Sequence, residues 1–253
     1  MWLDPFFPNK LAQDIVATVV TFAVALAWLR VIDALAHRRR SPSGGGLIEQ
    51  KLSRKIIHIG IGPLFVLCWN LFSAEPWARW LAALVPLAIT VQFVLVGLGV
   101  IKDEAAVKAM TRHGDPREIL HGPLYYGIVF VLCTIIFWRH SPVGILALML
   151  MCGGDGLADV VGRRWGRAKL PFNRDKSWAG SAAMFAGSFV FGFGFLALFT
   201  AFGNFPPTLN LTSTAGGVAL ISLVCTVVEA MPLHDIDNIT VTVIAIVLGL
   251  WWF

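Results

Sequence analysis

One stretch of this sequence reads Pro142-Val-Gly-Ile-Leu-Ala-Leu-Met-Leu-Met-Cys-Gly-Gly-Asp155-Gly-Leu-Ala-Asp159-Val-Val-Gly-Arg-Arg-Trp-Gly166. It begins as an apolar run and ends in a basic segment. Two acids, Asp155 and Asp159, are four residues apart, so on a helix both carboxylates face the same side. An ionisable side chain within a membrane segment is expensive and indicates a functional site. We interpret the stretch as a membrane helix that carries a metal–nucleotide site at the membrane surface.

The composition around this stretch is that of a membrane protein. Hydrophobic residues make up 57% of the chain and charged residues 14%, against about 25% charged in an average soluble domain. The apolar residues come in blocks of about 20, the length that crosses a hydrocarbon core of about 30 Å. The blocks lie near 13–36, 56–73, 78–100, 119–138, 142–161, 178–202, 211–231 and 237–253.

These blocks exclude a soluble core. We predict an all-α, polytopic integral membrane protein with about eight transmembrane helices, which form one transmembrane domain over residues 1–253. Within it, 1–50 hold the first span and a basic loop, and 51–253 hold the remaining core. The first block is too long for a signal peptide, and its basic residues follow it, so we expect it to remain as a membrane helix.

The basic residues predict the orientation of the spans. Of the 20 Lys and Arg residues, six, four and six fall in the segments 36–55, 101–118 and 162–177. These loops follow the first, third and fifth spans, and the positive-inside rule assigns them to the cytoplasm. The net charge of +5 therefore reflects topology and anionic headgroups, and it gives no argument for nucleic acid.

Side chains suited to phosphoryl transfer gather after the fifth span. Asp155 and Asp159 suit Mg²⁺, a hard cation that usually takes one or two carboxylates plus substrate phosphates. Positive charge for a polyphosphate would come from a basic cluster: Arg163, Arg164, Arg167, Lys169, Arg174 and Lys176. The alternative is that the Gly-rich helix and the cationic loop serve packing and topology alone. Since no Walker motif or kinase signature set is present, soluble-kinase machinery is not expected.

Close backbone approach, either to a ligand or between helices, is favoured by Gly153, Gly154, Gly156, Gly162 and Gly166. Ser177 and Ser181 are suited to cap the helix that follows, whose N-terminus favours anions. The four cysteines stand singly in apolar blocks, without zinc or redox spacing, and are interpreted as inert buried thiols.

A second acidic segment lies near the end of the chain and contains Glu229, Asp235 and Asp237 around Pro232. It falls on the same predicted side as the first pair of acids, which favours one shared site. A structural salt bridge from Glu229 or Asp237 to the basic cluster is the alternative.

Three further residues suggest where a lipid alcohol would bind. His58 follows Arg54 and Lys55 into the second span, and its alternative role is that of a bonded packing residue. His121 and Tyr125 flank a Gly-Pro pair that should break or kink the start of the fourth span. For these two the alternative is a kink followed by an interfacial aromatic belt.

These motifs together resemble the phytol kinase and polyprenol (dolichol-type) kinase family, whose relatives include CDP-diacylglycerol synthases. The similar segments are Gly154–Gly166, Lys169-Leu-Pro-Phe-Asn173, Lys176–Ser181, Val228–Pro232 with Asp237-Asn238, Arg54–His58 and Gly122–Tyr126. The chain has Ala179 where the synthases have Glu, which fits the kinases better. It has one Asp before Asn238 where phytol kinases often have two, and its loop after Pro232 is shortened.

The resemblance implies a CTP-dependent, Mg²⁺-assisted kinase that phosphorylates the hydroxyl of a membrane isoprenoid alcohol, such as phytol, farnesol, geranylgeraniol or a polyprenol. It implies catalytic roles for Asp155, Asp159 and Lys176, and metal binding by Asp155, Asp159, Glu229 and Asp237. It implies nucleotide binding by Gly154, Gly162, Arg163, Arg164, Gly166, Lys169, Asn173, Ser177, Gly180 and Ser181. It places the lipid near His58, His121 and Tyr125, and the active site on the cytoplasmic face.

Three other functions stay open: a CTP-dependent diacylglycerol kinase, a CDP-lipid cytidylyltransferase that would use the same nucleotide site, and an ion-coupled transporter. A transporter predicts solute flux without a nucleotide, but its acids would not be expected beside Arg-rich loops. The oligomeric state does not follow from the sequence.

Overall fold

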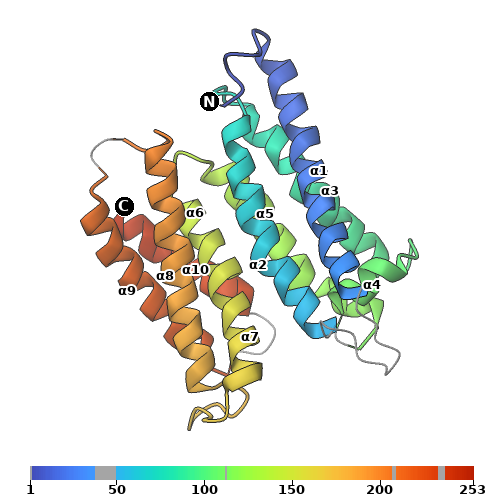
Figure 1. Cartoon of the computed structure of the whole chain (residues 1–253), viewed down its shortest axis with the longest axis vertical. Helices are drawn as coiled ribbons and strands as arrows, with labels where there is room; N and C mark the ends of the chain where they lie inside the picture. The colour runs from blue at the N-terminus through green and yellow to red at the C-terminus, as the bar shows by residue number, and fades with distance from the viewer. Residues whose placement is uncertain (1, 38–49, 112, 207–208, 233–236) are drawn as a thin grey trace. The chain divides into compact units, whose positions relative to one another are not determined.

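The computed structural model describes residues 2–37, 50–111, 113–206, 209–232 and 237–253. Within these ranges the secondary structure is helical, and the β contact is one isolated bridge between Lys169 and Ser177. The predicted all-α class is confirmed (Figure 1). The fold divides into two compact units, Met1–Ile135 and Ile136–Phe253. Their grouping into one transmembrane domain stays a prediction.

Long apolar helices account for the predicted spans. Six are long and apolar enough to cross a membrane: Lys10–Ile32, Ala78–Gly97, Pro116–Ile136, Pro142–Trp165, Trp178–Ala201 and Leu211–Glu229. The other two predicted spans correspond to shorter apolar helices, Lys55–Leu71 and Ile239–Trp252. The chain is therefore a multi-pass membrane protein, with eight apolar helical segments in the described ranges where the sequence predicts about eight.

The first unit contains α1 (Lys10–His37), α2 (Gln50–Cys68), η1 (Trp69–Leu71), α3 (Ala78–Gly97), α4 (Glu104–Met110), η2 (Pro116–Leu120) and α5 (Gly122–Ile136). Helix α1 packs against α2 and α3, and η2 packs against α3. The break predicted at Gly122-Pro123 is present, because the 3₁₀ helix η2 ends at Leu120 and α5 begins at Gly122.

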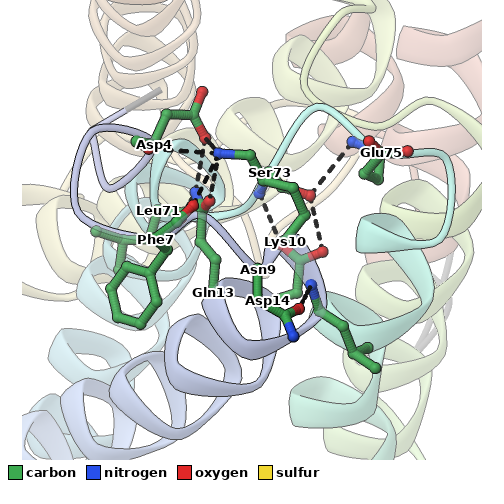
Figure 2. A network of polar contacts seen from close by, with 10 residues as sticks. Asp4, Phe7, Asn9, Lys10, Gln13, Asp14, Leu71, Ser73 and Glu75 are labelled. Carbon is green, nitrogen blue, oxygen red and sulfur yellow. Dashed lines mark hydrogen bonds and ion pairs between the residues drawn. The ribbon is translucent and has the colours of Figure 1, made fainter.

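A network of polar contacts joins α1 to the residues around η1 (Figure 2). Asp14 on α1 is fully buried, and its two carboxylate oxygens accept hydrogen bonds from the backbone N–H and the hydroxyl of Ser73, at 2.6 and 2.8 Å. Nearby, the Gln13 amide donates to Asp4 Oδ1 at 2.9 Å and to the Leu71 carbonyl at 3.1 Å. Because a buried charge costs free energy unless it is hydrogen-bonded, these bonds stabilise the acid in an apolar helix and join α1 to the segment after η1.

The second unit contains α6 (Pro142–Met149), η3 (Leu150–Asp155), α7 (Gly156–Trp165), α8 (Trp178–Ala201), α9 (Leu211–Glu229) and α10 (Asp237–Trp252). The first three form one continuous rod, in which η3 is a π-helical turn. The rod packs against α8 and α10, and α9 packs against both of those helices (Figure 1). The residues from Val143 to Gly154 are all buried, so this rod is the core of the unit.

Candidate active site

The two acids of the apolar stretch lie where the wide turn η3 passes into α7. Asp155 is the last residue of η3, Asp159 lies in the first turn of α7, and both are half-buried. The predicted helical spacing therefore holds, and both carboxylates lie toward one face of the rod. A π-helical turn is rare and occurs frequently at functional sites, so the local backbone also singles out this position.

One oxygen of Asp159 has no hydrogen-bond partner among the described residues. Oδ1 accepts from Arg163 Nε at 2.8 Å, whereas Oδ2 is shielded from the surface and unbonded. A buried unsatisfied polar atom is uncommon and calls for an explanation such as a missing ion or water. Among the described side chains, no three His, Cys, Asp or Glu residues lie close enough to hold a metal by themselves.

The glycines of the motif hold the rod against α8. A Cβ at Gly154 would lie 2.2 Å from Ser188 Oγ, and a Cβ at Gly166 would lie 2.4 Å from the Oγ of Ser177, the N-cap of α8. A Cβ at Gly180 would lie 3.1 Å from the Ala158 carbonyl. These glycines therefore serve close helix packing, one of the two roles considered from the sequence; a direct contact with nucleotide stays a prediction.

The loop between α7 and α8 folds back onto the end of α9. Leu170 is buried, and its N–H donates to the Lys176 carbonyl at 3.2 Å. The buried Asn173 amide donates to the Ala230 carbonyl at 3.0 Å. Lys176 forms an ion pair with Glu229, which is 4% exposed. The two motifs that the sequence separates by about 50 residues are thus in contact, and Glu229 neutralises a cation of the basic cluster, as the salt-bridge alternative predicts.

The other members of the basic cluster lie on the surface of the second unit. Arg163 pairs with Asp159, and the Arg164 guanidinium lies 5.4 Å from the centre of the Trp165 ring. Exposed side chains complete the set: Arg167, Lys169 and Arg174. Cations that are exposed and anchored beside a half-buried carboxylate suit an anionic ligand that arrives from water.

Three serines, the N-cap of α8 and two residues within it, complete this region. Ser177 caps α8, because its hydroxyl accepts from the Gly180 N–H at 3.2 Å. The hydroxyls of Ser181 and Ser188 are shielded from the surface and have no partner among the described residues. Ser188 is fully buried and was missed by the sequence analysis. Its signal is the seven-residue spacing from Ser181, which places both serines toward one side of an apolar helix.

The remaining predicted site residues lie elsewhere. Helix α10 begins at Asp237, whose side chain falls outside the described structure, as does Asp235. In the first unit, Tyr126 donates its hydroxyl hydrogen to the His58 carbonyl at 3.0 Å, and the two rings lie 4.3 Å apart. His121 is exposed and Tyr125 is half-buried. The His58 ring therefore packs against Tyr126, and a role in lipid binding stays a prediction for all three residues.

Comparison with known proteins gives one consistent result. A probable chloroplastic phytol kinase 3 from Glycine max is 43% identical over 243 residues, which cover 95% of this chain and 73% of the relative. A probable chloroplastic phytol kinase 1 from Oryza sativa subsp. japonica is 46% identical over 231 residues, or 90% of the chain and 71% of the relative. The chloroplastic phytol kinase 1 of Arabidopsis thaliana is 40% identical over 235 residues, or 92% and 74%. No protein-family model matches the chain, and no solved structure matches it either.

Proposed function

The chain belongs to the phytol kinase family, and from this premise we propose that it transfers the terminal phosphoryl group of CTP to the hydroxyl of an isoprenoid alcohol. It is a membrane phosphotransferase with an alcohol acceptor. The observation that carries the finer proposal is the unpartnered Oδ2 of Asp159. The carboxylate pairs with Arg163 of the basic cluster, within a motif that resembles those of CTP-dependent lipid kinases.

The donor set fits a hard divalent cation. Asp155 and Asp159 offer carboxylate oxygens one helical turn apart, and Oδ2 of Asp159 has no hydrogen-bond partner in the part of the chain that the structure describes. Mg²⁺ is usually held by one or two carboxylates together with substrate phosphates, so the absence of a third acid from the described group is compatible with it. Bound there, Mg²⁺ would neutralise negative charge on the nucleotide phosphates.

The basic cluster would bind the triphosphate. Arg163 and Arg164 lie one turn after the acids on α7, where they would face the phosphates of a nucleotide held at Asp155 and Asp159. Lys176 would exchange Glu229 for phosphate oxygens, which would free Glu229 to face the metal. Fixed positive charges of this kind stabilise the charge that develops on the transferred phosphoryl group.

The chemical step is a direct displacement at the terminal phosphorus. The alcohol oxygen forms a bond to that phosphorus while the bond to the oxygen of the CDP leaving group breaks. The hydroxyl proton passes to a carboxylate of the site. The chain contributes the positions of both reactants, which is most of what phosphoryl transfer requires of a protein.

The membrane side of the site follows from the charges. The loops that carry most of the Lys and Arg residues would face the cytoplasm or the compartment equivalent to it, and the basic cluster belongs to one of them. The matched relatives are named chloroplastic, so an internal plastid-type membrane is one setting for this orientation.

The decisive experiment labels CTP at either the γ or the α phosphorus. Purified protein in detergent receives Mg²⁺ with phytol, longer prenols or diacylglycerol, and the lipids are then extracted. We expect label from the γ position alone, in a prenyl monophosphate. Label from the α position after addition of lipid phosphates would instead establish a cytidylyltransferase. Label from the γ position in phosphatidic acid would show that diacylglycerol is the acceptor. No label with either CTP or ATP would overturn the kinase proposal.

A further inference from the structure

Helix α8 carries a polar residue and three aromatic residues at a constant spacing. Ser181, Phe185, Phe189 and Phe193 are each four residues apart, which places successive side chains next to one another on the helix surface. The Phe185 and Phe189 rings are stacked with their centres 6.5 Å apart, and those of Phe189 and Phe193 are 5.7 Å apart and within 10° of parallel. We call these three residues the phenylalanine ladder.

The residue that precedes the ladder in this row, Ser181, lies beside the candidate active site. Gly180 packs directly against Ala158, since a Cβ at Gly180 would lie 3.1 Å from the Ala158 carbonyl. Asp159 and Ser181 are the next residues on the two helices, so each lies one position from this crossing. Each has an oxygen that is shielded from the surface and has no partner among the described residues. The crossing therefore has unused hydrogen-bonding capacity for one more polar group.

The ladder also lies at the edge of the packed surface of α8. The buried face of the helix is formed by residues such as Met184, Ser188 and Gly192. The ladder residues follow these by one position, so they are rotated away from the packed face by about 100°. Phe185 is 36% exposed, and Phe189 and Phe193 are half-buried. An apolar ligand can therefore contact the rings without displacing the core.

We propose that the phenylalanine ladder binds the isoprenoid chain of the acceptor, with Ser181 positioning the hydroxyl end beside Asp159. This inference rests on the proposed function. The distance along the axis from Ser181 to Phe193 is about 18 Å at the rise of an α-helix, which suits an extended chain of several isoprene units. An isoprenoid alcohol has one polar end and a long apolar body, and the row from Ser181 to Phe193 has the same order.

The test is a chain-length series measured on single variants. Geraniol, farnesol and geranylgeraniol differ by one isoprene unit each, so they reach different distances along the ladder. We expect Phe185→Ala to raise KM for all three alcohols, and Phe193→Ala to raise it only for the longest, by about two- to tenfold. Ser181→Ala is expected to lower kcat more than it raises KM, because it mispositions the hydroxyl.

The matched control is Phe22→Ala. Phe22 lies on α1 and is 38% exposed, close to the 36% of Phe185, but it has no place in the ladder. We expect it to leave all three KM values unchanged. Equal effects of the ladder and control variants, or a Phe193→Ala effect that is the same for all three alcohols, would overturn the inference and leave the ladder as a surface in contact with bulk lipid.

A binding measurement separates this inference from the proposed function. Geranylgeraniol with a diazirine at its far end is irradiated with the wild-type protein in detergent, and the labelled peptide is identified. We expect label on α8 near Phe193 that unlabelled geranylgeraniol removes by competition. Label elsewhere would overturn the ladder even in an active enzyme. Absent transfer with competed label on α8 would instead reject the kinase reaction and retain the binding site.

Discussion

Two acids in apolar helices of this chain have opposite surroundings. Asp14, in the first unit, is fully buried and has a donor from Ser73 on each carboxylate oxygen. Asp159, in the second unit, has one oxygen paired with Arg163 and one that is buried and unbonded. The first acid has both oxygens bonded within the protein, and the second has one oxygen without a hydrogen-bond partner among the described residues. The difference teaches that an acid in a membrane helix is a functional candidate only after its partners have been counted.

The largest expected effect comes from neutralising the unsatisfied acid. Asp159→Asn should reduce phosphoryl transfer by at least about a hundredfold, because it removes a charge directed at the reacting phosphates. The melting temperature should stay near the wild-type value, since Oδ2 has no bond in the described structure to lose. Transfer to lipid and thermal unfolding in detergent would be measured on the same preparation.

Two companion variants sharpen this result. Asp155→Asn and the charge-conserving Asp159→Glu should also abolish transfer, because the first removes a ligand and the second displaces one. A transfer rate close to wild type in either variant would refute the assignment of these acids to the metal.

The satisfied acid should behave in the opposite way. Asp14→Asn replaces an acceptor by an amide that presents N–H groups to the Ser73 donors, so we expect a loss of about 1–3 kcal/mol in the free energy of unfolding. Activity per folded molecule should be unchanged. A double-mutant cycle with Ser73→Ala would isolate the coupling between these two residues. Intact stability together with lost activity would reverse the comparison and make Asp14 a functional residue.

A smaller effect is expected at the pair between Lys176 and Glu229. Glu229→Gln removes the negative charge that pairs with the partly exposed ammonium of Lys176, and it should lower kcat/KM about tenfold with a stability loss of about 1 kcal/mol. The double variant Lys176→Glu with Glu229→Lys should restore stability but not transfer, because the cation then lies on the wrong segment. Restored transfer in the double variant would show that the pair acts only as an anchor.

A weaker effect still should follow from Arg163→Gln. Its ion pair with Asp159 is partly exposed, and such pairs stabilise proteins by about 0.2–1 kcal/mol. The melting temperature should therefore hardly change, while KM for CTP rises a few-fold and becomes less dependent on salt. An unchanged KM would remove Arg163 from the triphosphate site.

The smallest effect is expected at Asp4, outside the first span. Burial raises the pKa of this carboxyl, hydrogen bonds from Gln13 and Lys10 are among the interactions that lower it, and the net pKa is below the ordinary value of 3.8. A lowered folded-state pKa stabilises the protein above the unfolded value, and that contribution is lost as pH falls through the folded value. Asp4→Asn should therefore slightly flatten the loss of stability below pH 3.8. An identical acid-unfolding curve for the variant would contradict this.

Most of the helices could be predicted from the sequence, and most of the contacts between them could not. The apolar blocks mark the spans because membrane thickness dictates their length. The four-residue spacing of Asp155 and Asp159 carried over directly, since helical periodicity is local. The pairing of Lys176 with Glu229 joins residues 53 positions apart, and no local pattern encodes it.

Asp14 is a second residue whose contacts could not be predicted from the sequence. It is an acid inside the first predicted span, which would by default suggest function, and the sequence analysis did not single it out. Its partner Ser73 lies 59 positions later, at the end of the second apolar block. Only the folded structure shows that both oxygens are bonded. The π-helical turn was also missed, because a run such as Leu150–Cys152 is equally apolar whichever hydrogen-bond register it adopts.

That wide turn sets the rotation of one half of the rod against the other. Each residue added to or removed from a helix changes the phase of everything after it by about 100°. The apolar half, α6, and the half that carries the acids, α7, are joined through η3 (Leu150–Asp155), so their phases are set at this one junction. Deleting a single residue there would turn the carboxylates toward another neighbour while leaving every side chain of the motif in the sequence. The geometry of the candidate active site therefore depends on the spacing between the motif and the apolar span as well as on the motif itself.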